Sequence, residues 1–348
     1  MKIMVVTGSR ADYGLLEPVI EKLKTEHIVV LVATGTQVGN GDINVETLLV
    51  SNTELGVTKS MGLGVSGFGQ VFSMVTPDWL LVLGDRYEVF SACVAATVHR
   101  IPIIHIGGGD TTEGSYDESF RHCITKMSHL HFVTNQQAFD RVKQLGEENI
   151  HLVGSPGLDN ISGLKYLNDN YYVPRNSVMV IYHPTTLEEE ENVIELVNAV
   201  NSRIEGRTFI VSSNADNGSN KIDIELGKIY DRIFFNNLPR LNFLALLSEM
   251  SMIIGNSSAG LHEAPSLGVP TINIGDRQKG RLSGGSVVHC RLDYKEIVKA
   301  IDYLTNNTEL DYTNPYSEGN ASQKMLEIIR NYPEPKKLLK KRFIKCPE

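Results

Sequence analysis

The sequence lacks three features that would each define a class of protein. None of its four cysteines forms a Cys-x-x-Cys pair, so the sequence indicates neither a zinc site nor a redox dithiol. No stretch reaches the roughly 20 apolar residues of a membrane-spanning helix. Asp and Glu outnumber Lys and Arg by 41 to 33, and the net charge of −8 argues against a nucleic-acid-binding protein. An anionic ligand would therefore need local arginines and histidines to hold it.

The two ends of the sequence indicate a cytoplasmic protein without a membrane partner. An apolar segment begins directly after Met1 and Lys2, and the N-terminus lacks the cleavage pattern of a signal peptide. Cys93 lies in an apolar, helix-like stretch and is interpreted as core packing. The tail from Pro333 is rich in Lys and Arg and is expected to be a solvated end.

Apolar, strand-like runs alternate with helix-like segments along the chain. Continuous apolar runs such as Lys2–Thr7 are typical of parallel strands that helices cover on both faces. Between residues 157 and 174 the pattern gives way to Asn, Asp, Tyr and Pro and then restarts, which indicates a boundary. We therefore expect an α/β fold of two Rossmann-like, doubly wound domains that face a cleft. The first would cover residues 1–171, joined by a C-terminal helix within 322–348, and the second would cover residues 172–321.

Chemically reactive residues follow seven of the predicted strands. In open parallel sheets, ligands bind beyond the carboxyl ends of the strands. A purely structural explanation would not require all seven clusters to lie on that edge. The clusters begin at Gly8, Gly84, Gly107, His183, Ser213, Asn256 and Gly275.

The segment after the apolar run 252–254 is the most informative of these clusters. Small polar residues precede an expected helix at 261–267, which carries Glu263 in its first turns. Free N–H groups at a helix start bind anions, and a carboxylate can accept hydrogen bonds from two ribose hydroxyls. The pattern predicts a site for a nucleotide diphosphate, although an ordinary strand-to-helix turn favours the same residue types. The candidate binding residues are Asn256, Ser257, Ser258, Gly260 and Glu263, followed after the next strand by Arg277 and Arg281.

Other strand ends supply further candidate ligands. Arg10 opens a helix and can bind a diphosphate through two parallel hydrogen bonds, unless it pairs with Asp12. His183 suits a proton shuttle or a phosphate contact, although a lone histidine at a strand edge is often structural. Ser212 and Asn214 lie in a polar stretch that can read sugar or phosphate oxygens or can be a turn-rich surface loop.

The carboxylates of the first half of the chain are candidates for acid–base chemistry. Asp85 ends an apolar strand, a position that suits either an acid–base group or a helix N-cap. Asp110 follows three glycines and Asp117 lies at the expected start of a helix, so the two can converge on one substrate. Asp117 can instead cap the helix or pair with Arg121 one turn later. Removing a proton from carbon and protonating a leaving group require paired groups of this kind. Arg86, Arg121 and His122 are candidate substrate-binding residues.

A metal site is not indicated in this region. His105, Asp110 and His122 do not show a recognisable metal-ligand spacing.

Four separated motifs resemble the hydrolysing UDP-N-acetylglucosamine 2-epimerases, in the same order from residue 2 to about residue 330. The resemblance implies a glycosyltransferase-B-like fold with a C-terminal helix that crosses back onto the first domain. It also implies release of UDP and N-acetylmannosamine from UDP-N-acetylglucosamine and water, the first step of bacterial sialic acid synthesis for a capsule or surface polysaccharide. The motifs are residues 8–14, 84–86, 117–129 and 255–265 with 275–281.

The chemistry implied by the resemblance is an elimination followed by a hydration. A base removes the proton on sugar carbon 2, UDP leaves carbon 1, and the resulting glycal takes up water while carbon 2 is reprotonated on its other face. The family uses no nicotinamide or metal cofactor, and we expect a homo-oligomer, a dimer or tetramer. By resemblance the catalytic residues are Asp85, Asp110, Asp117 and His183. The resemblance also implies that Ser257 and Ser258 bind the diphosphate and that the carboxylate of Glu263 binds the ribose. Arg10 and Arg277 are the arginines expected on the nucleotide side.

Asp110 departs from the commoner family pattern, which has Glu after the glycines. The shorter side chain withdraws the carboxylate by about one carbon–carbon bond, and shifts of that size affect reaction rates strongly. A related subgroup acts on UDP- or GDP-linked 2,4-diacetamido-trideoxy sugars in legionaminic acid-type biosynthesis. The sequence leaves both substrates open.

Two other classes of function compete with these readings. A glycosyltransferase on the same scaffold would need an acceptor but no acids clustered around residues 85 to 117. A non-catalytic nucleotide-sugar-binding protein would gain nothing from carboxylates near an anionic ligand, because like charges repel.

Overall fold

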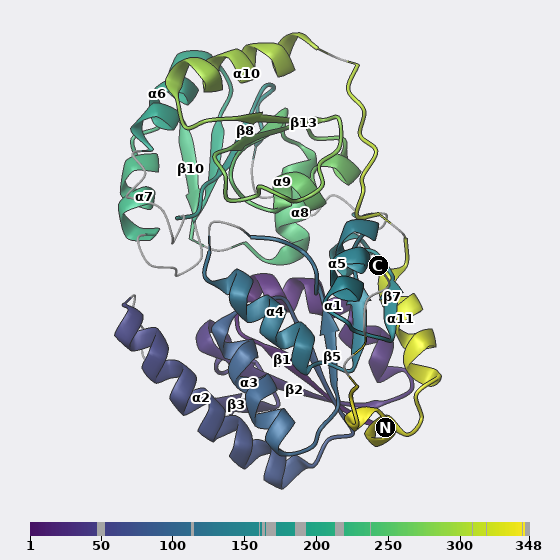
Figure 1. The fold of residues 1–348 in the computed structure, drawn as a ribbon. Coiled ribbons are helices and arrows are strands. Elements are labelled where there is room, and N and C mark those ends of the chain that lie inside the picture. The colour runs from purple at the N-terminus through teal and green to yellow at the C-terminus, as the bar shows by residue number, and fades with distance from the viewer. Residues whose placement is uncertain are drawn as a thin grey trace. The chain divides into compact units, whose positions relative to one another are not determined.

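The computed structural model divides the chain into two compact units (Figure 1). Unit 1 comprises Met1–Asp110, Asp117–Asp159 and Tyr316–Glu348, and unit 2 comprises Thr111–Tyr116 and Asn160–Pro315. The structure describes residues 1–46, 53–112, 115–159, 161, 164, 172–184, 193–212, 219–236, 238–307, 309–317, 319–342 and 344.

Unit 1 is built on a seven-stranded sheet with the order β3-β2-β1-β4-β5-β6-β7, and every pair of neighbouring strands is parallel. Because parallel strands need crossover connections, helices alternate with them along the chain. The strands are β1 Lys2–Thr7, β2 Ile28–Thr34, β3 Ile43–Val45, β4 Trp79–Leu83, β5 Ile103–Ile106, β6 Leu130–Val133 and β7 Ile150–Leu152. The helices are α1 Arg10–Lys24, α2 Glu54–Val75, α3 Tyr87–Val98, α4 Asp117–Met127, α5 Gln136–Gln144 and α11 Ala321–Arg330.

Helices cover both faces of this sheet. Ile3 and Val5 of β1 pack in one buried cluster with residues of α1 and α11. Met4 and Val6 pack in a second cluster with residues of α2, α3 and α4. Successive side chains of a strand point to opposite faces, so both faces of β1 are buried, as its continuous apolar sequence predicts.

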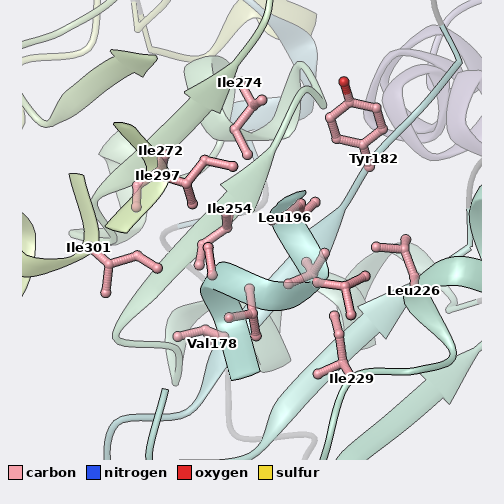
Figure 2. Close-up of a cluster of buried hydrophobic side chains, with 14 of the residues drawn as sticks. Val178, Tyr182, Leu196, Leu226, Ile229, Ile254, Ile272, Ile274, Ile297 and Ile301 are labelled. Carbon is pink, nitrogen blue, oxygen red and sulfur yellow. The ribbon is translucent and has the colours of Figure 1, made fainter. Parts of the chain in front are cut away.

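Unit 2 is built on a six-stranded sheet with the order β10-β9-β8-β11-β12-β13, again with parallel pairs. Figure 2 shows one of its buried clusters, where Val178 and Ile254 meet Leu196 of α6 and Ile297 of α10. The other face packs on α8. The strands are β8 Val178–Ile181, β9 Thr208–Val211, β10 Arg232–Phe235, β11 Met252–Gly255, β12 Thr271–Ile274 and β13 Val287–Cys290. The helices are α6 Ile194–Arg203, α7 Ser219–Leu226, α8 Arg240–Ser248, α9 Ala259–His262 and α10 Tyr294–Asn306.

These two parallel, doubly wound sheets confirm the predicted α/β fold class. Among the residues that the structure describes, no helix combines the length and apolar character needed to span a membrane.

The helix expected at 261–267 is wrong in its bounds. The structure has a short helix α9 at Ala259–His262 and a separate 3₁₀ turn at Pro265–Leu267. Proline has no N–H to donate to the helical hydrogen-bond ladder, so the ladder is interrupted at Pro265. Glu263 consequently occupies the C-cap of α9 rather than the first turns of a longer helix.

The expectation of a solvated C-terminal tail is wrong at Lys341. Its ammonium donates to the carbonyl oxygens of Lys126 and Ser128, each at 2.6 Å, and to Glu147 Oε2 at 2.5 Å. Lys126 Nζ contacts Glu147 Oε1 at 2.5 Å, and His131 Nε2 lies 3.3 Å from Oε2. Two ammonium groups therefore contact the buried carboxylate of Glu147, and the contacts of Lys341 anchor the tail to unit 1.

Candidate active site

The predicted acids of unit 1 follow neighbouring strands of its sheet. β4 pairs with β1 on one side and β5 on the other, so the turns after these strands lie at the same edge. Gly84 and Gly107 begin two of the turns with φ of +79° and +83°. Glycine adopts this left-handed backbone without strain, which lets the chain leave the sheet sharply. The turns bring Asp85 and Asp110 to that edge.

Arg121 of α4 is the centre of the acid cluster. Its side chain is buried, with 4% exposure, and it forms an ion pair with Asp85. Its Nε lies 3.5 Å from Glu118 Oε2. Burial opposes the charge of Arg121, but Asp85, Asp110, Glu118 and Asp117 outweigh that effect and raise the pKa of its guanidinium above the usual value. The three predicted catalytic acids thus act electrostatically on one buried cation, which the sequence had suggested only as a substrate ligand or as an intrahelical partner of Asp117.

Asp110 is held by two residues that the sequence analysis missed. Its Oδ1 accepts hydrogen bonds from Thr134 Oγ1 at 2.9 Å and Asn135 Nδ2 at 3.3 Å. Asn135 also caps α5, because its Oδ1 accepts from Ala138 N at 2.9 Å. Both residues directly follow β6, so the strand-end rule that identified the other clusters could have found them. The carboxylate of Asp110 therefore has a fixed orientation.

A second charged group lies at the ends of β1 and β4. Arg86 donates to both carboxylate oxygens of Glu88, at 3.2 and 3.3 Å. Glu88 is buried beside the turn at Gly35, where a Cβ atom would come within 2.7 Å of Glu88 Oε1. Burial raises the pKa of Asp12 to about 6, with Arg86 opposing the shift. Glu88 is a structural partner of Arg86 that sequence reasoning did not single out.

Two further predicted ligands of unit 1 are Arg10 and His122. The backbone of Arg10 begins α1, and its side chain lies outside the described part of the chain. His122 is 42% exposed in its side chain and lies 3.5 Å from Glu118 Oε1. His105, in contrast, is buried between Gly84 O at 2.8 Å and Thr125 Oγ1 at 3.2 Å, and burial lowers its pKa to about 3.

Asn256 is the centre of the corresponding edge in unit 2. Its side-chain amide donates to His183 O at 2.7 Å and accepts from His183 N at 2.6 Å. Its backbone carbonyl accepts from Arg277 Nη1 at 3.1 Å and Gln278 Nε2 at 2.8 Å. These bonds tie together the ends of β8, β11 and β12. The amide of Asn256 therefore stabilises the fold. Gln278 is a buried partner of Asn256 that the sequence analysis missed.

His183 is buried beside Arg277. Burial and then the charge of Arg277 lower the pKa of His183 well below its usual value, so its imidazole is neutral near pH 7. Its Nδ1 is buried and has no hydrogen-bond partner among the described residues. A neutral imidazole next to a guanidinium can contact an anion without adding a proton to the site.

The loop after β11 places the remaining predicted ligands of this edge. Ser257 Oγ accepts from Ala259 N at 3.3 Å, and Ser258 is the N-cap position of α9. A Cβ atom at Gly260 would lie 2.5 Å from Thr271 Cγ2, so close packing on β12 requires glycine there.

Glu263 has a cationic partner that the sequence analysis missed. The carboxylate is buried, and its Oε1 lies 2.7 Å from Arg240 Nη2. Arg240 is the first residue of α8, 23 positions earlier in the sequence, so only the tertiary fold brings the pair together.

Three candidate residues lie in other surroundings. Ser212 donates to Asp223 Oδ2 of α7 at 2.5 Å. Asn214 lies outside the described residues. Arg281 donates to Thr111 O at 2.5 Å and to Thr112 Oγ1 at 3.0 Å, both within unit 2.

Within the described ranges, no cluster of three or more His, Cys, Asp or Glu side chains is arranged to hold a metal ion.

Two doubly wound sheets with polar clusters at their strand ends define an α/β protein of the glycosyltransferase-B type. The sequence profile of the UDP-N-acetylglucosamine 2-epimerase family matches residues 2–330, and the chain belongs to this family.

Known relatives cover almost the whole chain. The polysialic acid biosynthesis protein P7 of Escherichia coli is 35% identical over 100% of this chain and 98% of its own length. The hydrolysing UDP-N,N′-diacetylbacillosamine 2-epimerase of Legionella pneumophila is 31% identical over 98% of both. The UDP-GlcNAc 2-epimerase of Neisseria meningitidis, solved with UDP-GlcNAc, superposes with a TM-score of 0.81 at 19% identity, covering 95% of this chain and 100% of that one. The structural likeness supports the fold.

Proposed function

We propose that this protein is a hydrolysing UDP-N-acetylglucosamine 2-epimerase that converts UDP-N-acetylglucosamine and water into N-acetylmannosamine and UDP, for sialic acid biosynthesis. The observation that carries the proposal is the grouping of Asp85, Asp110 and Asp117 around the buried Arg121. Membership of the epimerase family supports an enzyme that acts on a nucleotide sugar. The hydrolysing type agrees with the relative from Legionella pneumophila, which is a hydrolysing 2-epimerase.

The proposed reaction requires two proton transfers at sugar carbon 2. A base takes the proton as UDP leaves carbon 1, and an acid returns a proton to the opposite face when water adds to carbon 1. A single carboxylate on one face cannot serve both steps, so a group of carboxylates suits this chemistry. The guanidinium of Arg121 stabilises ionised carboxylates next to it and holds them in place. Asp110, oriented by Thr134 and Asn135, is one of the two proton-transfer candidates.

The residues at the strand ends of unit 2 form the proposed binding site for UDP. Arg277 supplies a positive charge, and the neutral His183 adds hydrogen-bonding capacity without competing for the proton chemistry. Ser257 and Ser258 offer small side chains and backbone N–H groups for the diphosphate. Glu263, held by Arg240, is the proposed ribose ligand. Since α9 has only four residues, this site depends on the arginine and local N–H groups rather than on a helix dipole.

A second substrate deserves a direct test, because one relative is named for it. The relative from Legionella pneumophila is a hydrolysing 2-epimerase of UDP-N,N′-diacetylbacillosamine, and Asp110 is shorter than the Glu of the commoner family pattern. A UDP- or GDP-linked 2,4-diacetamido-trideoxy sugar is therefore the alternative substrate. Both candidates use the same elimination and hydration.

Product analysis with both nucleotide sugars tests the proposal. Purified protein is incubated separately with UDP-N-acetylglucosamine and with the diacetamido analogue, and the products are separated and identified by NMR. We expect free N-acetylmannosamine and free UDP from the first substrate. Turnover of the diacetamido analogue alone would assign the second substrate, and an epimerised sugar still attached to UDP would contradict the hydrolysing reaction.

A further inference from the structure

The segment that connects two of the proposed catalytic acids changes units. Asp110 and Asp117 belong to unit 1, whereas Thr111–Tyr116 belongs to unit 2. We refer to the first two residues of this segment, Thr111 and Thr112, as the link. Both link residues are buried, and the Asp110–Thr111 peptide is one of the points where the chain passes from one unit to the other.

Arg281 fixes the link. Its Nε donates to Thr111 O at 2.5 Å, and its Nη2 donates to Thr112 Oγ1 at 3.0 Å. Thr111 Oγ1 also donates to Lys279 O at 3.4 Å. Two donors of one guanidinium thus hold two consecutive residues, a geometry that suits the rigid fork of arginine and not the single point charge of lysine.

Packing and hydrogen bonds hold Gly109 and Asp110, the residues just before the link, within unit 1. At Gly109, with φ of +80°, a Cβ atom would lie 2.3 Å from Ala138 O, so the chain passes directly against the start of α5. Arg141 Nη1 donates to Gly109 O at 3.1 Å, and Asp110 Oδ1 is held by hydrogen bonds from β6-end residues. Only the Asp110–Thr111 peptide separates the hydrogen bonds of Gly109 and Asp110 from those of Thr111 and Thr112.

We infer that Arg281 is a positioning residue, which acts through Thr111 and Thr112 to set the placement of the Asp110 carboxylate. A planar peptide transmits a displacement of Thr111 directly to the backbone of Asp110. A carboxylate that transfers a proton is sensitive to such a displacement, because a misplacement of about 1 Å can cost about 10²-fold in rate. Arg281 therefore acts on the backbone that directly follows Asp110. The catalytic part of this inference rests on the proposed function.

Steady-state kinetics of three variants test the inference. We expect Arg281→Ala to lower kcat by about 10- to 100-fold while the Kd for UDP, measured by calorimetry, stays within about twofold. Thr112→Val removes one acceptor of the fork and should lower kcat less, and Thr112→Ser restores the hydroxyl and should restore the rate. Lys279→Ala is the matched control, because it keeps the carbonyl that Thr111 contacts and should behave like the wild type. A Kd for UDP weakened by about tenfold or more with unchanged kcat in Arg281→Ala would make Arg281 a direct nucleotide ligand and overturn the inference.

A measurement without turnover separates this inference from the proposed function. Deuterium uptake by peptides that contain Thr111 and Thr112 should be faster in Arg281→Ala and Thr112→Val than in the wild type and in Lys279→Ala. Unchanged uptake in both variants would contradict the claim that Arg281 holds the link. Faster uptake with unchanged kcat would contradict the positioning role of Arg281. If the wild type turns over neither nucleotide sugar, the proposed function fails while the uptake experiment still decides whether Arg281 holds the link.

Discussion

The edges of the two sheets carry opposite kinds of polar chemistry. In unit 1, four carboxyl groups act on the single guanidinium of Arg121. In unit 2, the neutral amide of Asn256 binds the backbone of His183 after β8, its backbone carbonyl accepts from Arg277 after β12, and Arg277 lies beside a neutral histidine. An ionised carboxylate repels an anionic ligand, whereas a cation with neutral neighbours attracts it. The first edge therefore suits proton transfer and the second suits the grip on an anion, although both follow the same strand-end rule.

The largest effect that separates the two edges should come from one acid of unit 1. Asp117→Asn removes a proton-accepting group with almost no change of shape, and we expect kcat to fall by about 10³-fold. The Kd for UDP should stay within about twofold, because the carboxylate is assigned to the sugar chemistry. The control is Asp276→Asn, an exposed aspartate after β12 whose carboxylate lies 3.4 Å from Lys279 Nζ, and it should leave both values unchanged. Equal losses of turnover in the two variants would remove the distinction between the edges.

The stability of the acid cluster should depend on its one buried cation. Arg121→Met leaves the Asp85 carboxylate without its ion-pair partner, and we expect the free energy of unfolding to fall by about 3 kcal/mol. Urea denaturation measures the change. His122→Ala on the same helix removes an exposed side chain and should shift the free energy by less than about 0.5 kcal/mol. A small change in the free energy of unfolding for Arg121→Met would show that the carboxylates do not need the guanidinium of Arg121.

Asn256 should matter for the fold of unit 2 more than its serine neighbours do. Asn256→Ala leaves the backbone N–H and C=O of His183 unsatisfied, so we expect a loss of about 2 kcal/mol in the free energy of unfolding. Ser257→Ala removes only one weak acceptor, at 3.3 Å from Ala259 N, and should cost less than about 0.5 kcal/mol. Similar stabilities of the two variants would contradict the role of the Asn256 amide in joining the ends of β8 and β11.

The ribose assignment predicts a smaller effect that is confined to binding. Glu263→Gln keeps the size of the side chain and removes its charge, and we expect UDP to bind about tenfold more weakly, which corresponds to about 1.4 kcal/mol, with little change in kcat. Glu249→Gln at the C-cap of α8 provides a control, whose affinity should equal that of the wild type. Calorimetry with UDP measures both, and an unchanged affinity for Glu263→Gln would remove the ribose role.

The last comparison concerns a buried carboxylate between two ammonium groups, in contrast to the buried guanidinium of Arg121 among acids. Burial alone would raise the pKa of Glu147, but hydrogen bonds from His131, Lys126 and Lys341 hold it at about 2, below its usual 4.5. A depressed carboxyl pKa stabilises the folded state above the unfolded-state pKa, and this stabilisation is lost as the pH falls towards the folded-state value. The wild type should thus exceed Glu147→Gln in stability at pH 7, and the difference should shrink between pH 4.5 and about 2. Denaturation curves at several pH values check this, and a constant difference would contradict it.

The sequence was sufficient for the fold class, because continuous apolar strands alternating with helices permit little besides covered parallel sheets. It was also sufficient to locate the reactive residues at strand ends. It could not assign their partners, since Asp85 and Arg121 are 36 positions apart and Glu263 and Arg240 are 23 apart. Those contacts depend on how loops meet in three dimensions, which no local pattern encodes.

The same limit explains why some candidate ligands have structural roles. Asn256 and Gly260 have the residue types of an anion-binding loop, but the amide of the first holds His183 and the second packs on Thr271. Sequence motifs record that a residue type is required, and the geometry shows whether the requirement comes from packing or from a ligand. The ligand roles of Ser257 and the catalytic roles of Asp110 stay predictions.

The central claim is that the acids of unit 1 move the proton on sugar carbon 2 while the sugar leaves its nucleotide. NMR of the wild-type protein with UDP-N-acetylglucosamine in heavy water measures this most directly. We expect free N-acetylmannosamine that carries one deuterium at carbon 2, formed at the same rate as UDP. Free sugar that retains hydrogen at carbon 2, with its original configuration, would contradict the account, because UDP would then be released without any proton transfer by these acids.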